Sequence, residues 1–352
     1  MCILLLSTAH PNYPLIVLSN RDEYLNRPTS SVDYWPEPYS DILGPRDLAR
    51  QEHGTWIGMS KTGRLAVLLN FRETEADDYI SPLSRGVLVK HFLSSNQSTS
   101  EWMEHAINSV GPAGLLSVGG FNMVCGIIRK SQDDNHERLQ PFGVLTNRSK
   151  SLSDGTSWLF DATTHHHMRG TTSQQDANYS GLDHTYGISN SLYAHPWPKV
   201  HRGRQLLTDV IRNSIAGTES ELIENLFDVL STDELPRHGI ETGNPAQVFE
   251  SLRHSIFIPV FRANEDMLQQ TEALSPLLVP SPDDELKPES TDKTEYKFVK
   301  GQFYGTRTQT VILVNNDGMV KYVEKTVHEI DKEEHQHEVA SHKTFEFKIQ
   351  DW

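Results

Sequence analysis

A cysteine stands directly behind the first methionine and in front of an apolar run at residues 3–6. Methionine aminopeptidases remove Met1 when the next side chain is small, so Cys2 is expected to carry both a thiol and a free α-amine. An α-amine, with an unperturbed pKa of about 8, can be the base that a thiol needs to become a thiolate. The apolar run is typical of a buried strand, which would hold Cys2 at the tip of a sheet rather than on a loose end.

The same N-terminus has other interpretations. A signal peptide is not expected, because no basic segment precedes residues 3–6 and the run is shorter than the ~7–15 apolar residues of such a peptide. N-myristoylation requires a glycine where Cys2 stands, whereas palmitoylation of Cys2 stays open. A cysteine at the second position can also arise by chance. We therefore expect a protein that is not secreted.

The composition bounds the class of protein. With 352 residues, of which 36% are hydrophobic, the chain can bury a substantial core, and we expect a single domain over residues 1–352. The net charge of −15, without a clustered basic track, argues against nucleic acid as a partner. Two cysteines exclude a disulfide framework and indicate a reducing, cytoplasmic compartment. No apolar window of the sequence approaches the ~20 residues that cross a bilayer, so any membrane contact would be peripheral.

Short apolar runs between turn residues predict antiparallel hairpins, and four stretches have helical periodicity. The expected strands cover residues 2–7, 15–19, 55–59, 65–69, 121–128, 142–146, 157–161, 186–191, 311–314, 319–323 and 344–349. The expected helices cover residues 85–94, 100–110, 200–211 and 222–230. Residues 264–294, rich in proline, serine and acidic residues, are expected to be a disordered insertion. This order of elements predicts an α+β layered domain with mostly antiparallel sheets.

A polar cluster, Ser-Asn-Arg-Asp-Glu at residues 19–23, ends the second expected strand. If the first two strands form a simple hairpin, the cluster lies close to the Cys2 thiol. Arg21 would then stabilise a thiolate, while a carboxylate could hold the α-amine or the arginine in place. A turn with a surface ion pair is the alternative interpretation of the same residues.

Further short motifs are spread along the chain. They are Met-Cys-Ile at 1–3, Arg-Pro at 27–28, Gly-Thr-Trp-Ile-Gly at 54–58, Leu-Asn-Phe at 69–71, Gly-Phe-Asn at 120–122, Gly-Ile-Ser-Asn-Ser at 187–191, Pro-Trp-Pro-Lys at 196–199 and Tyr-Gly-Thr-Arg-Thr-Gln-Thr at 304–310. Together with residues 19–23, this set resembles the NRDE proteins, the family of transport and Golgi organisation protein 2. The resemblance runs from residue 1 to about residue 347, interrupted by the acidic insertion.

The resemblance implies an αββα four-layer sandwich of the N-terminal nucleophile hydrolase type, with Cys2 as nucleophile. In related cysteine amidases, such as the choloylglycine hydrolases and penicillin V acylases, two arginines, an aspartate and two asparagines support that cysteine. Matched by position, the supporting residues are Arg21, Asp22, Asn70, Asn190 and Arg307, with the two asparagines on the oxyanion side. In those amidases the early arginine and the aspartate are separated by other residues, whereas Arg21 and Asp22 are adjacent. Neighbouring residues of a strand point to opposite faces of the sheet. Both can reach Cys2 only if the chain turns there.

If the site is active, Cys2 would attack an amide or thioester carbonyl after the α-amine takes its proton, and hydrolysis would need no cofactor. The resemblance also implies roles in Golgi and endoplasmic reticulum organisation, protein secretion, haem trafficking and lipid or acyl-CoA handling. The alternative is a non-catalytic carrier of haem or of a lipid on the same fold, in contact with Golgi or mitochondrial membranes. Expected ligands are therefore a small acyl-containing molecule or haem. Cys2 could ligate haem, whereas the histidines at 165–167 and 335–337 are more typical of solvated loops, and no metal site is expected.

Overall fold

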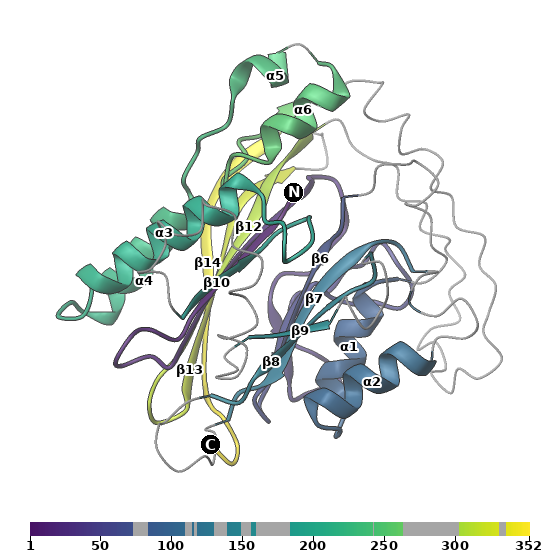
Figure 1. The fold of residues 1–352 in the computed structure, drawn as a ribbon, viewed down its shortest axis with the longest axis vertical. Helices are drawn as coiled ribbons and strands as arrows, with labels where there is room; N and C mark the ends of the chain where they lie inside the picture. The colour runs from purple at the N-terminus through teal and green to yellow at the C-terminus, as the bar shows by residue number, and fades with distance from the viewer. Residues whose placement is uncertain are drawn as a thin grey trace.

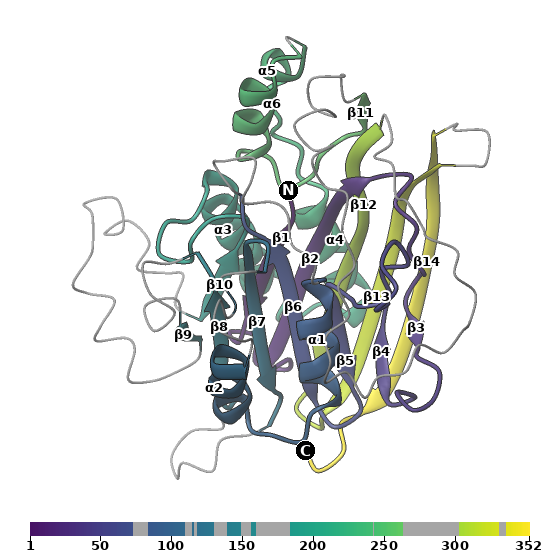
Figure 2. The same ribbon diagram turned by 90° about the vertical axis from the view of Figure 1, so that its right-hand side faces the viewer.

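The computed structural model describes residues 1–72, 84–109, 115, 118–129, 139–148, 156–159, 184–241, 243–262, 303–330 and 336–352. Two antiparallel sheets stack face to face, and helices cover the outer face of each (Figures 1 and 2). This layering is the αββα sandwich that the resemblance implied. The expected insertion at 264–294 lies outside the described residues.

The first sheet contains the N-terminus. Its order is β10-β1-β2-β12-β13-β14, with β11 (Phe261–Arg262) paired to β12. The other members are β1 (Ile3–Ser7), β2 (Leu15–Tyr24), β10 (Thr185–Ile188), β12 (Phe303–Val314), β13 (Met319–Ile330) and β14 (Gln336–Lys348). The predicted hairpin of the first two strands is confirmed, with Ile3 opposite Asn20. Because β2 continues to Tyr24, residues 19–23 are buried strand rather than a surface turn.

The second sheet is a meander in which each strand pairs with its neighbour in the chain, in the order β3-β4-β5-β6-β7-β8-β9. Its strands are β3 (Asp33–Tyr34), β4 (Ile42–Gly44), β5 (Ile57–Ser60), β6 (Arg64–Asn70), β7 (Phe121–Ile127), β8 (Phe142–Thr146) and β9 (Thr156–Leu159). The predicted hairpin of β5 and β6 is confirmed, and Asn70 is the last residue of β6, as expected.

The helices form the two outer layers. Helices α1 (Gly86–Ser94) and α2 (Thr99–Ser109) cover the second sheet, while α3 (Pro198–Asn213) and α4 (Glu219–Leu230) cover the first (Figure 1). Two shorter helices that the sequence did not predict, α5 (Arg237–Glu241) and α6 (Pro245–Leu252), lie beyond the end of the first sheet that carries the N-terminus. Among the helices of the described part, none is both long and apolar enough to span a membrane.

Alternation along β1 and β2 decides which side chains face which layer. Leu4 and Val17 belong to the apolar cluster between the two sheets, whereas Ile3 and Leu18 belong to the cluster under α3 and α4. Each fully buried aliphatic side chain contributes roughly 1.5–3 kcal/mol, so a one-residue slip of register would be expensive. With this register Cys2 shares the inter-sheet face with Leu4.

Candidate active site

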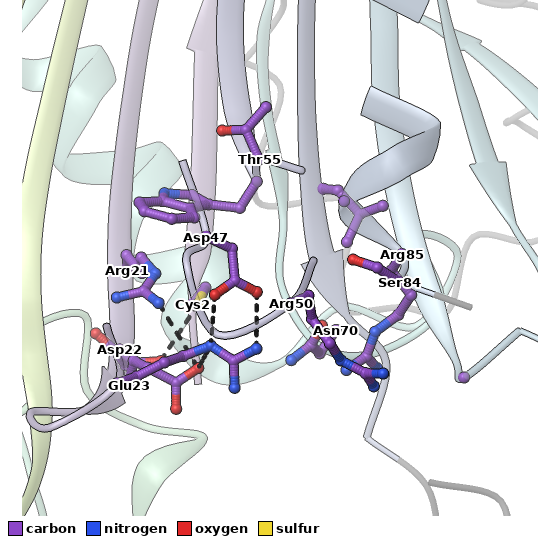
Figure 3. Close-up of a pocket in the computed structure, with 15 residues that line it drawn as sticks. Cys2, Arg21, Asp22, Glu23, Asp47, Arg50, Thr55, Asn70, Ser84 and Arg85 are labelled. Carbon is purple, nitrogen blue, oxygen red and sulfur yellow. Dashed lines mark hydrogen bonds and ion pairs between the residues drawn. The ribbon is translucent and has the colours of Figure 1, made fainter. Parts of the chain in front are cut away.

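A cavity of about 130 Å³ lies between the two sheets at the start of β1. Its volume is in the range of cavities that hold a benzene-sized group. The first sheet contributes Cys2 and Arg21 to its wall, and the second contributes Asn70 (Figure 3). The remaining lining residues are Asp22, Glu23, Arg27, Asp47, Arg50, Thr55, Trp56, Leu68, Ser84, Arg85, Gly86 and Gly119.

The Cys2 thiol faces this cavity. Its Sγ lies 3.7 Å from the backbone oxygen of Asp22, and the side chain is packed against the inter-sheet core. Burial raises the pKa of the Cys2 thiol, while the N-terminal ammonium and the Arg21 guanidinium act in the opposite direction. Because burial outweighs them, the thiol keeps its proton at neutral pH and needs a base to release it.

Arg21 is a buried cation that lines the same cavity. Its guanidinium lies 4.0 Å from the centre of the Trp56 ring, and its Nη2 is 3.9 Å from a Glu23 oxygen. Burial lowers the pKa of Arg21, and Glu23 opposes that shift. An aromatic face stabilises a desolvated guanidinium, so Trp56 holds a positive charge where a thiolate would form. Trp56 lies in one of the motifs noted above, but the sequence assigned it no role.

Beyond Arg21 the cavity wall is an ion-pair network. Arg27 donates to both oxygens of Asp47, at 3.2 and 2.7 Å, and its Nε is 3.8 Å from Glu23. Burial lowers the pKa of Arg27, but Glu23 and Asp47 outweigh burial and leave the pKa raised. Burial likewise raises the pKa of Asp47, and Arg27 outweighs it to leave the pKa lowered. These groups neutralise one another, so the wall is polar without depending on a ligand.

Asp22 points to the other face of the sheet, as expected for a neighbour of Arg21 in a strand. Its Oδ1 accepts a 2.7 Å hydrogen bond from the Thr306 hydroxyl, and its Oδ2 lies 3.2 Å from the Met1 nitrogen. The Met1 ammonium also donates to the Tyr304 hydroxyl. No turn is needed to bring both residues to the N-terminal segment, because Arg21 lies on the face of the Cys2 thiol and the Asp22 carboxylate lies on the other face, at the Met1 ammonium.

Lys199 completes this second face. It is 0% exposed and donates from Nζ to the backbone oxygen of Met1. Burial lowers the pKa of Lys199, with Asp22 and Cys2 opposing the shift. A fully buried lysine is rare unless it is paired. The sequence placed Lys199 in a motif but gave it no function, because a lysine after Pro-Trp-Pro reads locally as part of an exposed turn.

The remaining site residues of the sequence prediction differ in position. The Asn70 side chain lines the cavity, and Asn190 donates from Nδ2 to the Asn70 backbone oxygen. Next to Asn190, the Ser189 hydroxyl donates to the Cys2 backbone oxygen at 2.7 Å. Ser189 and Asn190 together therefore join the segment of Cys2 to the end of β6, and Asn190 is not among the residues that line the cavity.

Arg307 was also expected beside Cys2, but it does not line the cavity. It donates from Nη1 to the backbone oxygen of Arg27, and burial together with the nearby Arg21 lowers its pKa to about 10. The physical reason is a shift of register between Thr306 and Thr308, where β12 pairs with β2. Arg307 is the extra residue at this bulge, and a bulge redirects the side chain it carries.

Within the described part of the chain, no three or more His, Cys, Asp or Glu side chains are grouped so that they could hold a metal ion. The histidines at 165–167 lie outside the described residues, as does residue 335, and the side chains at 336–337 are not described either.

A four-layer αββα sandwich with a cysteine at the start of a central strand, between a buried arginine and a buried aspartate, has the architecture of the N-terminal nucleophile hydrolases. The chain belongs to the Transport and Golgi organisation 2 family, whose model matches residues 1–329.

Relatives extend over almost the whole chain. An uncharacterised protein of Saccharomyces cerevisiae is 28% identical over 363 residues, covering 99% of this chain and 100% of the yeast protein. The human Transport and Golgi organization protein 2 homolog is 28% identical, covering 96% of this chain and 94% of the human protein.

Two solved structures are also similar to this chain. The Caenorhabditis elegans N-acylethanolamine-hydrolyzing acid amidase ortholog has 13% identity and a TM-score of 0.39, covering 66% of this chain and 87% of the amidase. A mutant of the conjugated bile acid hydrolase of Clostridium perfringens has 11% identity and a TM-score of 0.42, covering 99% of this chain and 97% of the hydrolase.

Proposed function

We propose that the protein is a cysteine-type N-terminal nucleophile hydrolase that cleaves an amide or thioester bond once Met1 has been removed. One observation carries the proposal. Cys2 presents its thiol to a polar cavity on one face of the sheet, and the residue bonded to its main-chain nitrogen, Met1, has its ammonium at Asp22 and Tyr304 and its carbonyl oxygen at Lys199. Loss of Met1 would turn that nitrogen into an α-amine beside the thiol of the same residue.

The reaction follows from this arrangement. The α-amine takes the thiol proton, the sulfur attacks the carbonyl carbon, and Arg21 stabilises the thiolate before attack. The Asn70 amide, which lines the cavity, donates to the oxyanion of the tetrahedral intermediate. The C–N or C–S bond then breaks, the leaving group takes the proton back from the amine, and water hydrolyses the acyl-Cys2 thioester. Asn190 acts by holding the Asn70 backbone rather than by touching the substrate.

The family name supports a role for this activity in transport and Golgi organisation, and thereby in endoplasmic reticulum organisation and secretion. A hydrolase that removes or transfers acyl groups could act on molecules at the surface of those membranes. The proposed contact with those membranes is peripheral.

The test has two stages. The intact mass of the protein purified from a eukaryotic cell is measured first, and Met1 is expected to be absent with the Cys2 amine unmodified. The protein is then incubated with S-acetyl-N-acetylcysteamine, quenched in acid and mapped by peptide mass spectrometry. We expect acetyl on Cys2, none on the fully buried Cys125, and no turnover by Cys2→Ala.

Retention of Met1 on most molecules, or equal turnover by Cys2→Ala, would overturn the hydrolase. Cys2→Ser separates it from the alternative of a haem or lipid carrier, since a hydroxyl can retain slow acyl transfer but binds haem iron poorly. A carrier would lose haem binding in both Cys2 variants and show no acyl adduct in the unaltered protein.

A further inference from the structure

Met1 is bound by this protein as a ligand would be. Its ammonium lies 3.2 Å from Asp22 Oδ2 and donates to Tyr304, its carbonyl accepts from Lys199, and only 8% of its surface is exposed. A first residue that served only as a start signal would lie loosely in solvent, as chain ends generally do. Here every polar group of its backbone has a dedicated buried partner.

Among these partners, Lys199 has the largest free-energy cost of burial. It lies in the first turn of α3, directly after Pro198, where the positive end of the helix dipole opposes a cation. It is fully buried, and its hydrogen-bond acceptor at Met1 is a neutral carbonyl oxygen. A carboxylate at the same place would compensate the ammonium far better, because a charge-assisted hydrogen bond is roughly twice as strong as one to a neutral acceptor. The position is therefore suited to a negatively charged oxygen.

The methionine side chain is buried among apolar side chains. It belongs to a buried cluster to which α6 contributes Val248 and Leu252. The other buried members are Tyr24, Trp197, Leu235, Val248, Leu252 and Ile258. This cluster is separate from the inter-sheet core and from the core under α3 and α4. Without Met1 it would keep an apolar hollow beside Asp22 and Lys199.

We propose that, once Met1 is released, this place is a binding site for an apolar L-α-amino acid. Asp22 and Tyr304 receive the ammonium, Lys199 receives the carboxylate, and the cluster around Trp197 takes the side chain. The newly formed Cys2 amine lies next to the place of the Met1 carbonyl carbon, so the bound amino acid withdraws from it to hydrogen-bond distance and the amine adds a second donor to the carboxylate. The ammonium site, the carboxylate site and the apolar cluster have the spacing of one amino acid, because Met1 contacts all three in the structure.

The site also names a substrate class for Cys2, and in this the inference rests on the proposed function. An amino acid acylated on its nitrogen could still donate its amide N–H to Asp22 Oδ2, which lies 3.2 Å from the Met1 nitrogen. Its acyl group would extend around the start of β1 toward the Cys2 sulfur, which lies 3.7 Å from the backbone oxygen of the same aspartate. The sulfur would attack the acyl carbon and the C–N bond would break. The freed amino acid would take up the proton held by the Cys2 amine, and water would then release the acid from Cys2. The substrate class is an N-acylated apolar L-amino acid.

The test measures binding without turnover. Protein whose mass shows that Met1 is absent is titrated with L-methionine, D-methionine and L-methioninol in a calorimeter. We expect L-methionine to bind, and the other two to bind at least roughly tenfold more weakly, which is the scale of one lost hydrogen bond to a charged group. Lys199→Met should lose a similar factor, while the matched Lys61→Met, on a half-exposed lysine 3.8 Å from Asp41, should bind as before.

Val248→Phe is a second variant in case Lys199→Met does not fold. It fills the apolar hollow while leaving Lys199 in place, and it should abolish L-methionine binding without slowing alkylation of Cys2. Equal binding of the D and L forms, absence of binding, or retention of Met1 on the native protein would each overturn the amino-acid site. An acyl-Cys2 adduct without L-methionine binding sinks this inference alone, whereas L-methionine binding without any adduct sinks the hydrolase and leaves the amino-acid site standing.

Discussion

The two faces of the first sheet at Cys2 differ in how their charged side chains are paired. On the thiol face, Glu23, Arg27 and Asp47 form ion pairs with one another, and Arg21 rests on an aromatic ring. On the amine face, the Asp22 carboxylate lies near two cations, the Met1 ammonium and Lys199. The first arrangement is self-contained, whereas the second depends on what occupies the position of Met1.

This difference indicates which face the protein keeps ready for a partner. A network whose charges are already paired gives a fixed environment, as a nucleophile requires. A buried lysine ammonium whose acceptor is a neutral carbonyl oxygen needs that hydrogen bond to offset the cost of its burial. The amine face is therefore the one expected to respond to Met1 removal and to ligands. The predictions below separate the two faces.

Asp22→Asn should have the largest effect on the free energy of unfolding. It removes the charge of the carboxylate that faces the Met1 ammonium and Lys199, and it leaves these buried cations without that counter-charge, which costs about 3–5 kcal/mol. Urea unfolding measures this loss. The matched Asp41→Asn removes the charge of a 60% exposed side chain 3.8 Å from Lys61 and should cost less than about 1 kcal/mol. If the two variants lost the same stability, the amine face would not depend on the Asp22 carboxylate.

Glu324→Gln should change the pH dependence of stability. Glu324 is buried on the inter-sheet side of β13, and its Oε1 accepts from the Val32 amide at 3.0 Å. Burial raises its pKa from 4.5 to about 7. Between these values the folded protein holds a proton that the unfolded chain has lost, so the free energy of unfolding falls as pH rises from about 4.5 to about 7, in total by ~3 kcal/mol.

Glu324→Gln lacks this fall, because its amide does not titrate. Urea unfolding should therefore show the variant more stable than the unaltered protein at pH 8 and equal to it at pH 4. A constant difference across this range would mean that the carboxyl titrates alike in the folded and unfolded states.

Arg21→Met should slow the reaction of the Cys2 thiol on the opposite face from Asp22. The guanidinium acts against burial to lower the pKa of the thiol, so its loss leaves less thiolate at neutral pH. Alkylation by iodoacetamide should become several-fold slower, with its pH profile displaced to higher pH. Arg202→Met, at a surface arginine 2.8 Å from Glu234, is the matched control and should react like the unaltered protein. An unchanged rate in Arg21→Met would remove Arg21 from the thiolate's surroundings.

Asn244→Ala should have the smallest effect on stability, and it should change binding on the amine face alone. The Asn244 side chain caps α6 by accepting from the amides of Ala246 and Gln247, at 3.0 and 3.4 Å. Loss of an N-cap of this kind costs about 1 kcal/mol. Because α6 carries Val248 and Leu252, L-methionine should bind more weakly, while the alkylation rate of Cys2 stays the same. A parallel drop in both readouts would mean that the faces are coupled.

Prediction from sequence was most successful in the N-terminal hairpin. The apolar runs at 2–7 and 15–19, separated by a turn-rich stretch, were enough to predict the pairing and the placement of Cys2 at the sheet end. The adjacency of Arg21 and Asp22 was enough to predict that their side chains point in opposite directions. Side-chain direction in a strand is a local property with a period of two residues, so it can be read from a short segment. The same holds for Asn70 at the end of β6.

Prediction failed where distant segments meet. Arg307 follows a strand pattern, but the bulge that moves it depends on how β12 pairs with β2. The importance of Asn190 was anticipated through the resemblance, yet its hydrogen bond to the Asn70 backbone could not be. Helices α5 and α6 are short, with too few turns for their periodicity to be recognised.

By itself, the sequence determined the family, the layered α+β architecture and the position of a cysteine with its arginine and aspartate. Motifs and strand alternation are properties of contiguous residues, so they can be recognised without the fold. Only the tertiary structure decided that Cys2 has two unlike faces and that Lys199 holds the Met1 carbonyl from 198 positions along the chain. Burial of a charged side chain is set by the partner that the fold brings to it, and no local pattern records that partner.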